Sequence, residues 1–189
     1  MGKVILGFTV SLDGFAEDIS GSVNSLYPDH EFLVQSDYMK ESILTTGAVV
    51  MSRKEYAMAD DVDLYAEYYE YQVPIFVVTD TLPEKHPKEN DNLTFTFVTS
   101  GYGDAIRKAK VAAGDRDVNI IGSALTCMVC LKTLLVDELQ IDTIPILLKD
   151  GFRPFESSDG LNIKLERIKS LELPEGRMHV SYKCNYLGN

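Results

Sequence analysis

Short runs of apolar and β-branched residues alternate with polar segments along most of the chain. The first run, residues 3–11, is almost uninterrupted, which is typical of a central strand covered on both faces. Similar runs predict further buried strands at 48–51, 75–78, 95–99 and 118–121. The long polar stretch at 13–28 contains glycine and is predicted to be an ordered loop, a kind of segment that often carries function.

Segments with helical spacing lie between these strands. Asp29 is expected to cap a helix that carries Phe32, Met39 and Ile43 on one face and stops at Gly47. Further helices are predicted at 55–71, where one or two helices would cover tyrosines, at 104–113 and at 124–135. The last helix is apolar on nearly every side and should therefore be buried.

The C-terminal third of the chain predicts strands only. The apolar positions shift phase between Ile141 and Ile144, which predicts a bulged strand over 139–148. Two alternating runs, 161–166 and 178–186, flank a turn and predict an antiparallel hairpin. This order of elements predicts an α/β fold with a mainly parallel sheet, an antiparallel edge and helices on both faces. Because no repeat or linker is visible, we expect residues 1–189 to form one domain.

Composition excludes several classes of function. The chain has 189 residues, of which 45% are hydrophobic, and its formal net charge of −11 argues against a nucleic-acid groove. No apolar run approaches the roughly 20 residues that span a bilayer. No apolar segment with a cleavage site follows Met1, so we expect a cytoplasmic protein without a membrane partner. Three cysteines are too few to indicate a disulfide framework.

Two predicted junctions between a strand and a helix carry candidate chemistry. At the first, Ser52, Arg53 and Lys54 open a polar helix; at the second, Gly122 and Ser123 make a tight turn into the apolar helix. Helix starts present unpaired N–H groups and a partial positive charge, and small residues let a phosphate approach. If the junctions face each other at the carboxyl edge of the sheet, they could clamp a pyrophosphate. Taken alone, each is more often an ordinary turn or a solvated pair of bases.

Several segments of the chain together resemble one known family. They are SLDGF at 11–15, GAVVMSRKEY at 47–56, VVT at 77–79, IIGSAL at 120–125, LVDEL at 135–139 and PF at 154–155. They are similar to the dihydrofolate-reductase-like family, which includes the C-terminal reductase domain of the bifunctional riboflavin-biosynthesis enzyme. The resemblance covers the whole chain and implies a three-layer fold, a reduction that uses NADPH or NADH, and a homodimer. The cofactor-binding residues it implies are Ser52, Arg53, Lys54, Thr79, Asp80, Gly122, Ser123, Ala124 and Leu125.

The chain departs from the family pattern at three of these positions. Ser52 and Ser123 stand where the family usually has glycine. Asp80 stands near the position where family members often hold the 2′-phosphate of NADPH with a cation. Because a carboxylate repels a phosphate but accepts hydrogen bonds from a ribose hydroxyl, we expect a preference for NADH or a loss of tight cofactor binding, unless Lys85 or Lys88 compensates.

The substrate side offers fewer signals. Candidate catalytic residues are Asp13, at the mouth of the expected cleft, and Asp37, near the place where dihydrofolate reductases carry their substrate-binding acid. A turn-forming role is equally compatible with Asp13, a solvated helix face is favoured for Asp37, and a register without gaps puts Ser36 at that place instead. Phe15 and Tyr56 are candidate substrate-binding residues that could equally pack in the core.

These features favour a stand-alone oxidoreductase that transfers a hydride from a nicotinamide dinucleotide to a small pteridine- or pyrimidine-like heterocycle. The alternative is a non-catalytic relative that keeps the fold and binds a ligand or a partner. Cys127 and Cys130 are expected to pack in the core rather than form a redox or zinc pair, and no metal site is predicted. The three histidines are expected at the surface or at an edge. The bifunctional riboflavin-biosynthesis enzyme also has a deaminase half, and the zinc-binding signature of that half is absent from this sequence.

Overall fold

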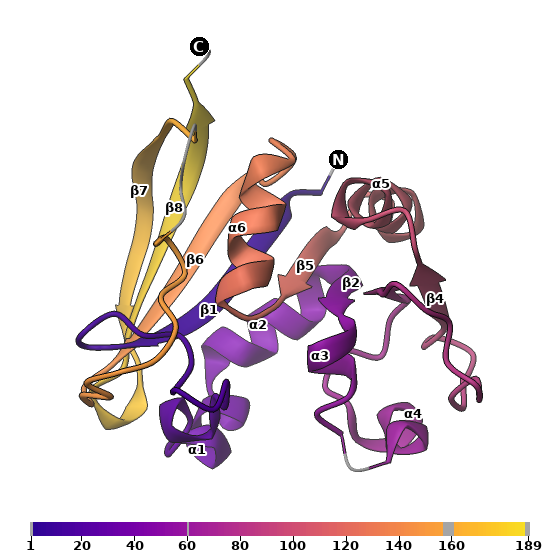
Figure 1. Cartoon of the computed structure of the whole chain (residues 1–189), viewed down its shortest axis with the longest axis horizontal. Helices are drawn as coiled ribbons and strands as arrows, with labels where there is room; N and C mark the ends of the chain where they lie inside the picture. Colours follow the sequence, from indigo (N-terminus) through magenta and orange to yellow (C-terminus); the bar gives the residue numbers. More distant parts are fainter. Residues whose placement is uncertain (1, 60, 157–160, 188–189) are drawn as a thin grey trace.

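Within residues 2–59, 61–156 and 161–187, which are the residues that the structure describes, the computed structural model contains one eight-stranded sheet (Figure 1). The strand order is β4-β3-β2-β5-β1-β6-β8-β7. The strands are β1 (Val4–Ser11), β2 (Thr46–Ser52), β3 (Ile75–Val78), β4 (Phe95–Val98), β5 (Asp117–Ile121), β6 (Glu138–Ile144), β7 (Ile163–Glu172) and β8 (Met178–Tyr186). The α-helices are α1 (His30–Gln35), α2 (Asp37–Thr45), α3 (Arg53–Tyr56), α4 (Tyr65–Tyr68), α5 (Tyr102–Ala113) and α6 (Ala124–Lys132).

The sheet has a parallel part and an antiparallel edge, as the order of elements predicts. Strands β1 to β6 run parallel to their neighbours, with Gly7 of β1 level with Ile121 of β5 and Gln140 of β6. The hairpin strands β7 and β8 pair antiparallel with each other, and β8 pairs antiparallel with β6. The carboxyl ends of β1, β2, β5 and β6 therefore point to the same edge of the sheet, where open α/β sheets bind ligands.

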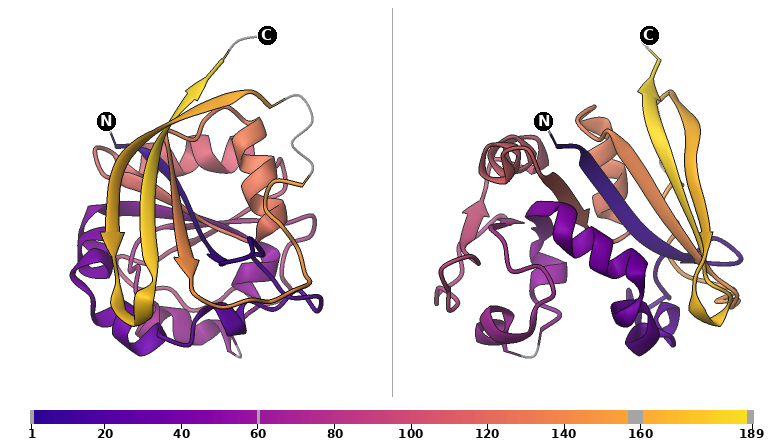
Figure 2. Two further views of the ribbon diagram at one scale, coloured as in Figure 1. Left: turned by 90° about the vertical axis from the view of Figure 1, so that its left-hand side faces the viewer. Right: turned by 180° about the vertical axis from the view of Figure 1, so that it is seen from behind.

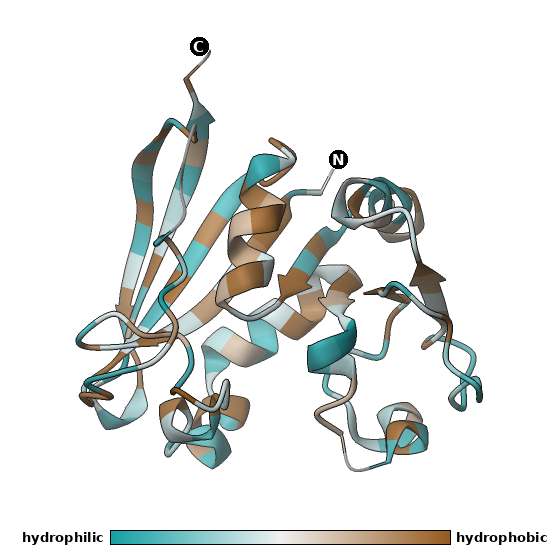
Figure 3. Ribbon diagram, viewed as in Figure 1, coloured by the Kyte–Doolittle hydropathy of each residue, from teal (hydrophilic) through white to brown (hydrophobic). Residues whose placement is uncertain are grey.

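Helices cover the two faces of the parallel strands, which gives three layers. One core cluster joins alternate residues such as Leu6 and Val50 to α5 and α6. The other face carries a second cluster around Met51 and Ile75, against which Met39 and Ile43 of α2 pack. Figure 2 shows α2 on the side of the sheet opposite to α6. Figure 3 shows α6 as mostly hydrophobic, in agreement with the burial predicted for that helix.

The edge strand β7 contrasts with this core because its residues are exposed on both sides. Leu165 is 40% exposed and Ile168 is 53% exposed. A bulge between Arg167 and Lys169 leaves Ile168 outside the regular pairing with β8. The bulge and the charged residues interrupt the apolar positions of this edge, which limits its pairing with other strands.

The single helix predicted after Asp29 is wrong, because the chain forms two helices. Ser36 lies between α1 and α2 in an extended conformation, with φ −67° and ψ 152°. Its hydroxyl accepts the backbone N–H of Met39 at 3.1 Å and caps the second helix. Asp29 precedes α1 but does not cap it, because its carboxylate binds Arg177 instead.

Two further predictions from local pattern are corrected by packing. Gly47 does not stop a helix but lies inside β2, where a Cβ would come within 2.7–2.9 Å of atoms of Arg116 and Ala113. The glycine therefore lets the end of α5 approach the strand. The bulge predicted over 139–148 is absent from β6, whose register is continuous and ends at Ile144. The phase shift arises because the chain leaves the sheet in a turn, where Ile146 N–H donates to Ile144 O at 2.8 Å.

Candidate functional site

A cavity of about 810 Å³ lies on the α2 side of the sheet, across four adjacent strands near their carboxyl ends. Its volume is in the range of small-molecule sites. At one end it is lined by Lys54, Glu55 and Ser123, which follow β2 and β5. At the other end it is lined by Gln140 and Asp142 of β6. Because only β1 lies between β5 and β6, these two ends are about 10 Å apart.

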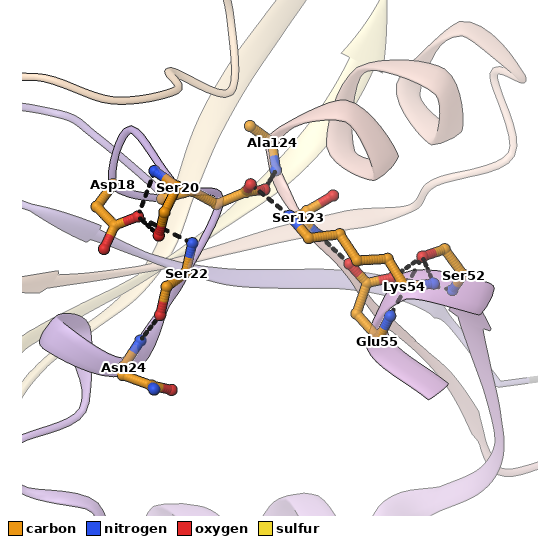
Figure 4. Close-up of polar contacts among 10 residues, drawn as sticks. Asp18, Ser20, Ser22, Asn24, Ser52, Lys54, Glu55, Ser123 and Ala124 are labelled. Atoms are coloured by element: carbon orange, nitrogen blue, oxygen red, sulfur yellow. Dashed lines mark hydrogen bonds and ion pairs between the residues drawn. The ribbon is translucent and has the colours of Figure 1, made fainter. Parts of the chain in front are cut away.

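The two predicted junctions adjoin at the first end of the cavity (Figure 4). Glu55 bridges them, because its Oε1 accepts the backbone N–H of Ser123 at 2.9 Å and its Oε2 accepts the backbone N–H of Ser52 at 3.0 Å. The Ser52 hydroxyl donates to the Glu55 carboxylate and accepts the N–H of Lys54 at 3.0 Å. It also accepts the backbone N–H of Glu55 at 3.4 Å, which completes a capping box. The junctions are thus close together, but these backbone donors are bound by the chain's own carboxylate.

A second carboxylate occupies the next donor of α6. Glu17, from the loop after β1, is 4% exposed, and its Oε1 accepts the backbone N–H of Ala124 at 3.0 Å. Its Oε2 lies 2.5 Å from the Nζ of Lys54, whose side chain is about half exposed. The start of α6 therefore already holds two anionic groups, which shows that its N–H groups attract negative charge.

Gly122 lets the chain turn tightly into α6. A Cβ at this position would lie 2.1 Å from Cγ2 and 2.3 Å from Cβ of Thr126. No ordinary contact is that short, so any side chain here would push the first turn of α6 away from β5. The glycine is therefore required for the position of the N–H groups of Ser123 and Ala124.

Asp142 forms the floor of the opposite end of the cavity and is held by a buried network. Its side chain is 10% exposed, and Oδ1 lies 2.7 Å from Nδ1 of His179. Because an ionised carboxylate only accepts hydrogen bonds, Nδ1 carries the hydrogen and donates it. The other ring nitrogen of His179 lies 2.9 Å from the hydroxyl of Ser181. His179 is 1% exposed, so the expectation that every histidine lies at the surface or an edge is wrong for this residue.

A fully buried arginine lies beside Asp142. Arg177 is 0% exposed and binds Asp29 through two bonds, Nε to Oδ2 at 2.7 Å and Nη2 to Oδ1 at 2.5 Å. Its remaining donors go to the Thr9 hydroxyl at 3.1 Å and to Leu26 O at 2.9 Å. Nη1 is 3.6 Å from Asp142, which is too long for a hydrogen bond. The guanidinium of Arg177 therefore pairs mainly with Asp29. Together, the Asp29 and Asp142 carboxylates and this guanidinium carry a net negative charge at the cavity floor.

Tyr38 of α2 completes this end of the cavity. Its ring centroid lies 4.4 Å from that of His179, and its hydroxyl donates to Oε1 of Gln140 at 3.3 Å. Burial raises the pKa of Tyr38 well above its ordinary value of 10, so the hydroxyl stays protonated and remains a donor. Gln140, Tyr38 and Asp142 therefore present polar atoms to one region of the cavity.

Three of the predicted cofactor-binding residues, Arg53, Thr79 and Asp80, lie outside the cavity lining. Nη1 of Arg53 donates to Thr81 O at 3.0 Å, and the hydroxyl of the buried Thr79 donates to the same oxygen at 2.7 Å. Asp80 follows Thr79 and is exposed. Lys85, which could compensate for Asp80, forms an ion pair with Asp63. Their binding of a cofactor stays a prediction.

The two predicted catalytic aspartates do not line the cavity. Asp13 accepts the Ser11 hydroxyl at 2.6 Å and the backbone N–H of Lys149 at 2.8 Å, so it ties the loop after β1 to the segment after β6. The hydrogen bond from Ser11 is the main reason that the pKa of Asp13 is lowered. Asp37 is fully exposed and contacts Lys40 at 3.3 Å. Its carboxylate lies in solvent because Tyr38 and Met39, the next residues of α2, face the cavity.

The other predicted contacts are also outside the cavity lining. Phe15 is buried under Arg153, whose guanidinium carbon lies 4.0 Å from the ring centroid. Tyr56 is buried and stacks on Tyr65, with ring centroids 5.8 Å apart. Leu125, in the first turn of α6, is 74% exposed. A direct role of these side chains in binding therefore has no support from the cavity geometry, although it has not been tested.

Sequence reasoning missed the carboxylates and the basic residues that the structure brings together. The missed residues are Glu17, Asp29 as a partner of Arg177, Glu55, Asp142, Arg177 and His179. A signal existed for Glu55, because Ser-x-x-Glu at 52–55 is the pattern of a capping box. The others pair with residues far away in the sequence and leave no local pattern.

The structure also describes the two cysteines of α6 and the groups that could bind a metal or a membrane. Cys127 and Cys130 are 0% exposed in the core beneath α6, which confirms that they pack there, and burial raises the pKa of both thiols. No group of three or more metal-ligating side chains occurs among the described residues. No helix in the described part of the chain is long and apolar enough to cross a membrane.

The three-layer α/β fold has a cavity at the carboxyl ends of its parallel strands, which is where α/β proteins of this class bind ligands. The family profile of the RibD C-terminal domain matches residues 2–178, and the chain belongs to this family. A comparison with curated proteins found no match.

Solved structures share the fold at low sequence identity. A protein assigned to riboflavin biosynthesis from Shewanella sp. PV-4 has 23% identity and a TM-score of 0.74, over 98% of this chain and 99% of that one. Dihydrofolate reductase from Enterococcus faecalis, complexed with NADP(H), has 12% identity and a TM-score of 0.60, over 97% of both chains. The deaminase/5-amino-6-(5-phosphoribosylamino)uracil reductase of Thermotoga maritima has 13% identity and a TM-score of 0.63, over 97% of this chain and 57% of that one. These likenesses establish the dihydrofolate-reductase-like fold.

Proposed function

We propose that this protein is a stand-alone reductase that uses NADPH or NADH to reduce a small pteridine- or pyrimidine-like heterocycle. The observation that carries the proposal is the cavity itself. One of its ends is lined by Ser123, at the start of α6, and by Lys54, and the other is lined by the carboxylate of Asp142, which His179 holds. Membership of the RibD C-terminal domain family supports the same assignment.

The donor set fits the diphosphate of a dinucleotide if Glu17 moves aside. The N–H groups of Ser123 and Ala124 already accommodate anionic oxygens at 2.9–3.0 Å, and Lys54 supplies a charge beside them. Once Glu17 has moved, the Ala124 N–H and the Lys54 ammonium would hold the diphosphate, with Arg53 on the side toward β3. A bound dihydronicotinamide supplies a hydride, which is the chemistry that the chain's own side chains lack.

The substrate would bind at Asp142. Its carboxylate is fixed by His179, its negative charge is not balanced by Arg177, and it borders the cavity. A heterocycle whose edge carries adjacent N–H donors, such as an amide or amidine group, satisfies this carboxylate, and the Tyr38 and Gln140 side chains lie beside it. In this proposal Asp142 takes the place that sequence reasoning gave to Asp37.

Thermal unfolding with NADPH, with NADH and without cofactor tests the proposal. A ligand at 100 times its dissociation constant adds about 2.7 kcal/mol, which raises the Tm of a chain of this size by about 5 to 11 °C. We expect a shift with at least one cofactor, and a larger shift with NADH if the exposed Asp80 lies beside the ribose. No shift with either cofactor would favour the non-catalytic alternative.

We also propose that residues 1–189 act as one domain, in the cytoplasm, as a homodimer without nucleic-acid or membrane partners. The net charge of −11 supports the absence of a nucleic-acid partner. The exposed apolar residues Leu165 and Ile168 of β7 support an interface at that edge. Light scattering tests the dimer, and the mass of a monomer at micromolar concentration would contradict it.

A further inference from the structure

We propose that Glu17 is an internal competitor for the diphosphate of the cofactor and thereby sets both the affinity and the selectivity of the site. The inference rests on the proposed function, since it concerns the same N–H groups. The Glu17 carboxylate binds the backbone N–H of Ala124 and the ammonium of Lys54, the two donors that a phosphate group would use.

The way in which α6 is capped is the first support. Ser123 occupies the N-cap position, and serine is among the best capping residues, yet its hydroxyl makes no capping bond. Instead, the N–H groups of Ser123 and Ala124 are bound by Glu55 and by Glu17, which is 107 positions away from Ala124 in the sequence. Two carboxylates on two consecutive donors reproduce the charge pattern of a diphosphate, and the cavity reaches Ser123, Glu55 and Lys54.

The two carboxylates differ in how firmly they are held. Glu55 cannot leave without breaking the capping box with Ser52 that begins α3. Glu17 caps no helix in its own part of the chain. Among the described residues, only the Ala124 N–H and the half-exposed Lys54 bind its carboxylate. Of the two groups, Glu17 is therefore the one that a ligand can displace at lower cost.

Displacement needs only a side-chain rotation. The backbone of Glu17 is fixed, because its carbonyl accepts the N–H of Phe152 at 2.9 Å and the Ala16 N–H donates to Phe152 O at 2.9 Å. The loop that follows is ordered separately by Asp18, whose carboxylate accepts the N–H groups of Ser20 and Ser22. The carboxylate of Glu17 can swing away from Ala124 while both of these contacts persist.

Displacing the Glu17 carboxylate costs binding free energy, and only ligands with an anionic group can recover that cost. A ligand with a phosphate at this end replaces the carboxylate and keeps both donors satisfied, whereas a ligand without an anionic group leaves Glu17 in place. Replacing the carboxylate by an amide removes the charge that holds Lys54, and a neutral hydrogen bond is weaker than a charged one. Glu17→Gln should therefore strengthen the binding of phosphate-bearing ligands about tenfold.

The test is calorimetric titration of inorganic pyrophosphate, NADPH and adenosine into the wild-type chain and two variants. Glu17→Gln is compared with Glu31→Gln, which makes the same change of charge at an exposed position in α1. Thermal melting establishes that both variants fold, and Glu17→Ala replaces Glu17→Gln if the latter does not. We expect tighter binding of pyrophosphate and NADPH only in the Glu17 variant, with adenosine unchanged.

Each outcome supports or overturns the inference about Glu17, and some outcomes also bear on the reductase proposal. If the wild-type chain binds NADPH but the Glu17 variant binds it equally or more weakly, the competitor inference is wrong and the reductase proposal stands. If the variant binds NADPH and the wild-type chain does not, both are supported. If neither chain binds pyrophosphate or NADPH, and thermal unfolding shows no shift with NADH, both are overturned. An equal gain in the Glu31 variant would show that net charge alone is responsible and would also overturn the inference.

Discussion

Replacing Arg177 by methionine should destabilise the protein by about 3 to 5 kcal/mol, because it leaves a buried carboxylate without its partner. Arg177 and Asp29 both have side chains with 0% exposure, and two direct bonds join them. Methionine fills part of the volume but offers no donor to Asp29, Thr9 or Leu26. For a chain of this size, the loss corresponds to a decrease in Tm of roughly 6 to 20 °C.

Urea unfolding at pH 7 measures this loss of unfolding free energy, provided that the wild-type chain and the variant have equal m-values. Arg167→Met on the exposed strand β7 is the matched control and should change the unfolding free energy by less than about 0.5 kcal/mol. The double variant Asp29→Asn/Arg177→Met removes both charges and should recover part of the loss. A loss in Arg177→Met no larger than in the control, or a double variant as unstable as the sum of the single ones, would refute the reasoning.

The pH dependence gives an independent check of the same pair. Burial raises the pKa of Asp29, but the bonds from Arg177 lower it by more, so its pKa lies below the ordinary value of 3.8. This contribution to stability is present above pH 3.8 and is lost as the pH falls through the lower folded-state pKa. Without Arg177, burial is the largest remaining cause, and the pKa of Asp29 should rise. The difference in stability between the two chains should therefore shrink as the pH falls from 7 to 3.

Two further predictions concern the cavity and its neighbourhood. Asp142→Asn should weaken the binding of 2,4-diaminopyrimidine about tenfold or more in calorimetry, because an amide accepts N–H groups less well than a carboxylate. Glu70→Gln, a change in the same cavity lining, is the control. Equal losses of affinity in the two variants would count against a role of Asp142 in binding. Tyr56→Phe should raise the unfolding free energy by about 1 kcal/mol, because the buried Tyr56 hydroxyl has no partner among the described residues. Tyr65→Phe should lower the unfolding free energy, since the Tyr65 hydroxyl donates to Tyr56 O. Weaker binding of 2,4-diaminopyrimidine in Tyr56→Phe would instead support the predicted substrate-binding role of Tyr56.

The parallel part of the fold could be predicted because its strands are buried on both faces. The residues of β1 and β2 are nearly all buried, so the sequence shows uninterrupted apolar runs there. The edge strand β7 shows alternation instead, and its pairing with β8 followed from the turn between them. The break at Ser36 was missed because the apolar spacing on α1 and α2 continues across it, while the capping hydroxyl acts within three residues.

The side chains at the two ends of the cavity could not be predicted in the same way. Alternation along β8 places His179 and Ser181 on one face, but it does not show that α2 covers this face and turns both residues into buried ones. The partners Arg177 and Asp29 are 148 positions apart, and only the tertiary fold brings them together. Burial of a charge depends on what lies above the strand, which local patterns do not contain.

Two of the three departures from the family pattern, Ser52 and Ser123, contact the same carboxylate, that of Glu55. Where the family usually has glycine, Ser52 supplies the hydroxyl that both receives the N–H of Lys54 and donates to Glu55. A glycine at that position would leave Glu55 with the backbone N–H of residue 52 but without the hydroxyl bond, so its other oxygen would be held less firmly on the N–H of Ser123. Serine at 52 therefore does more than adjust backbone freedom, because it fixes a negative charge at the start of α6. A ligand that reaches this end of the cavity therefore binds beside the negative charge of Glu55 and has to displace the carboxylate of Glu17.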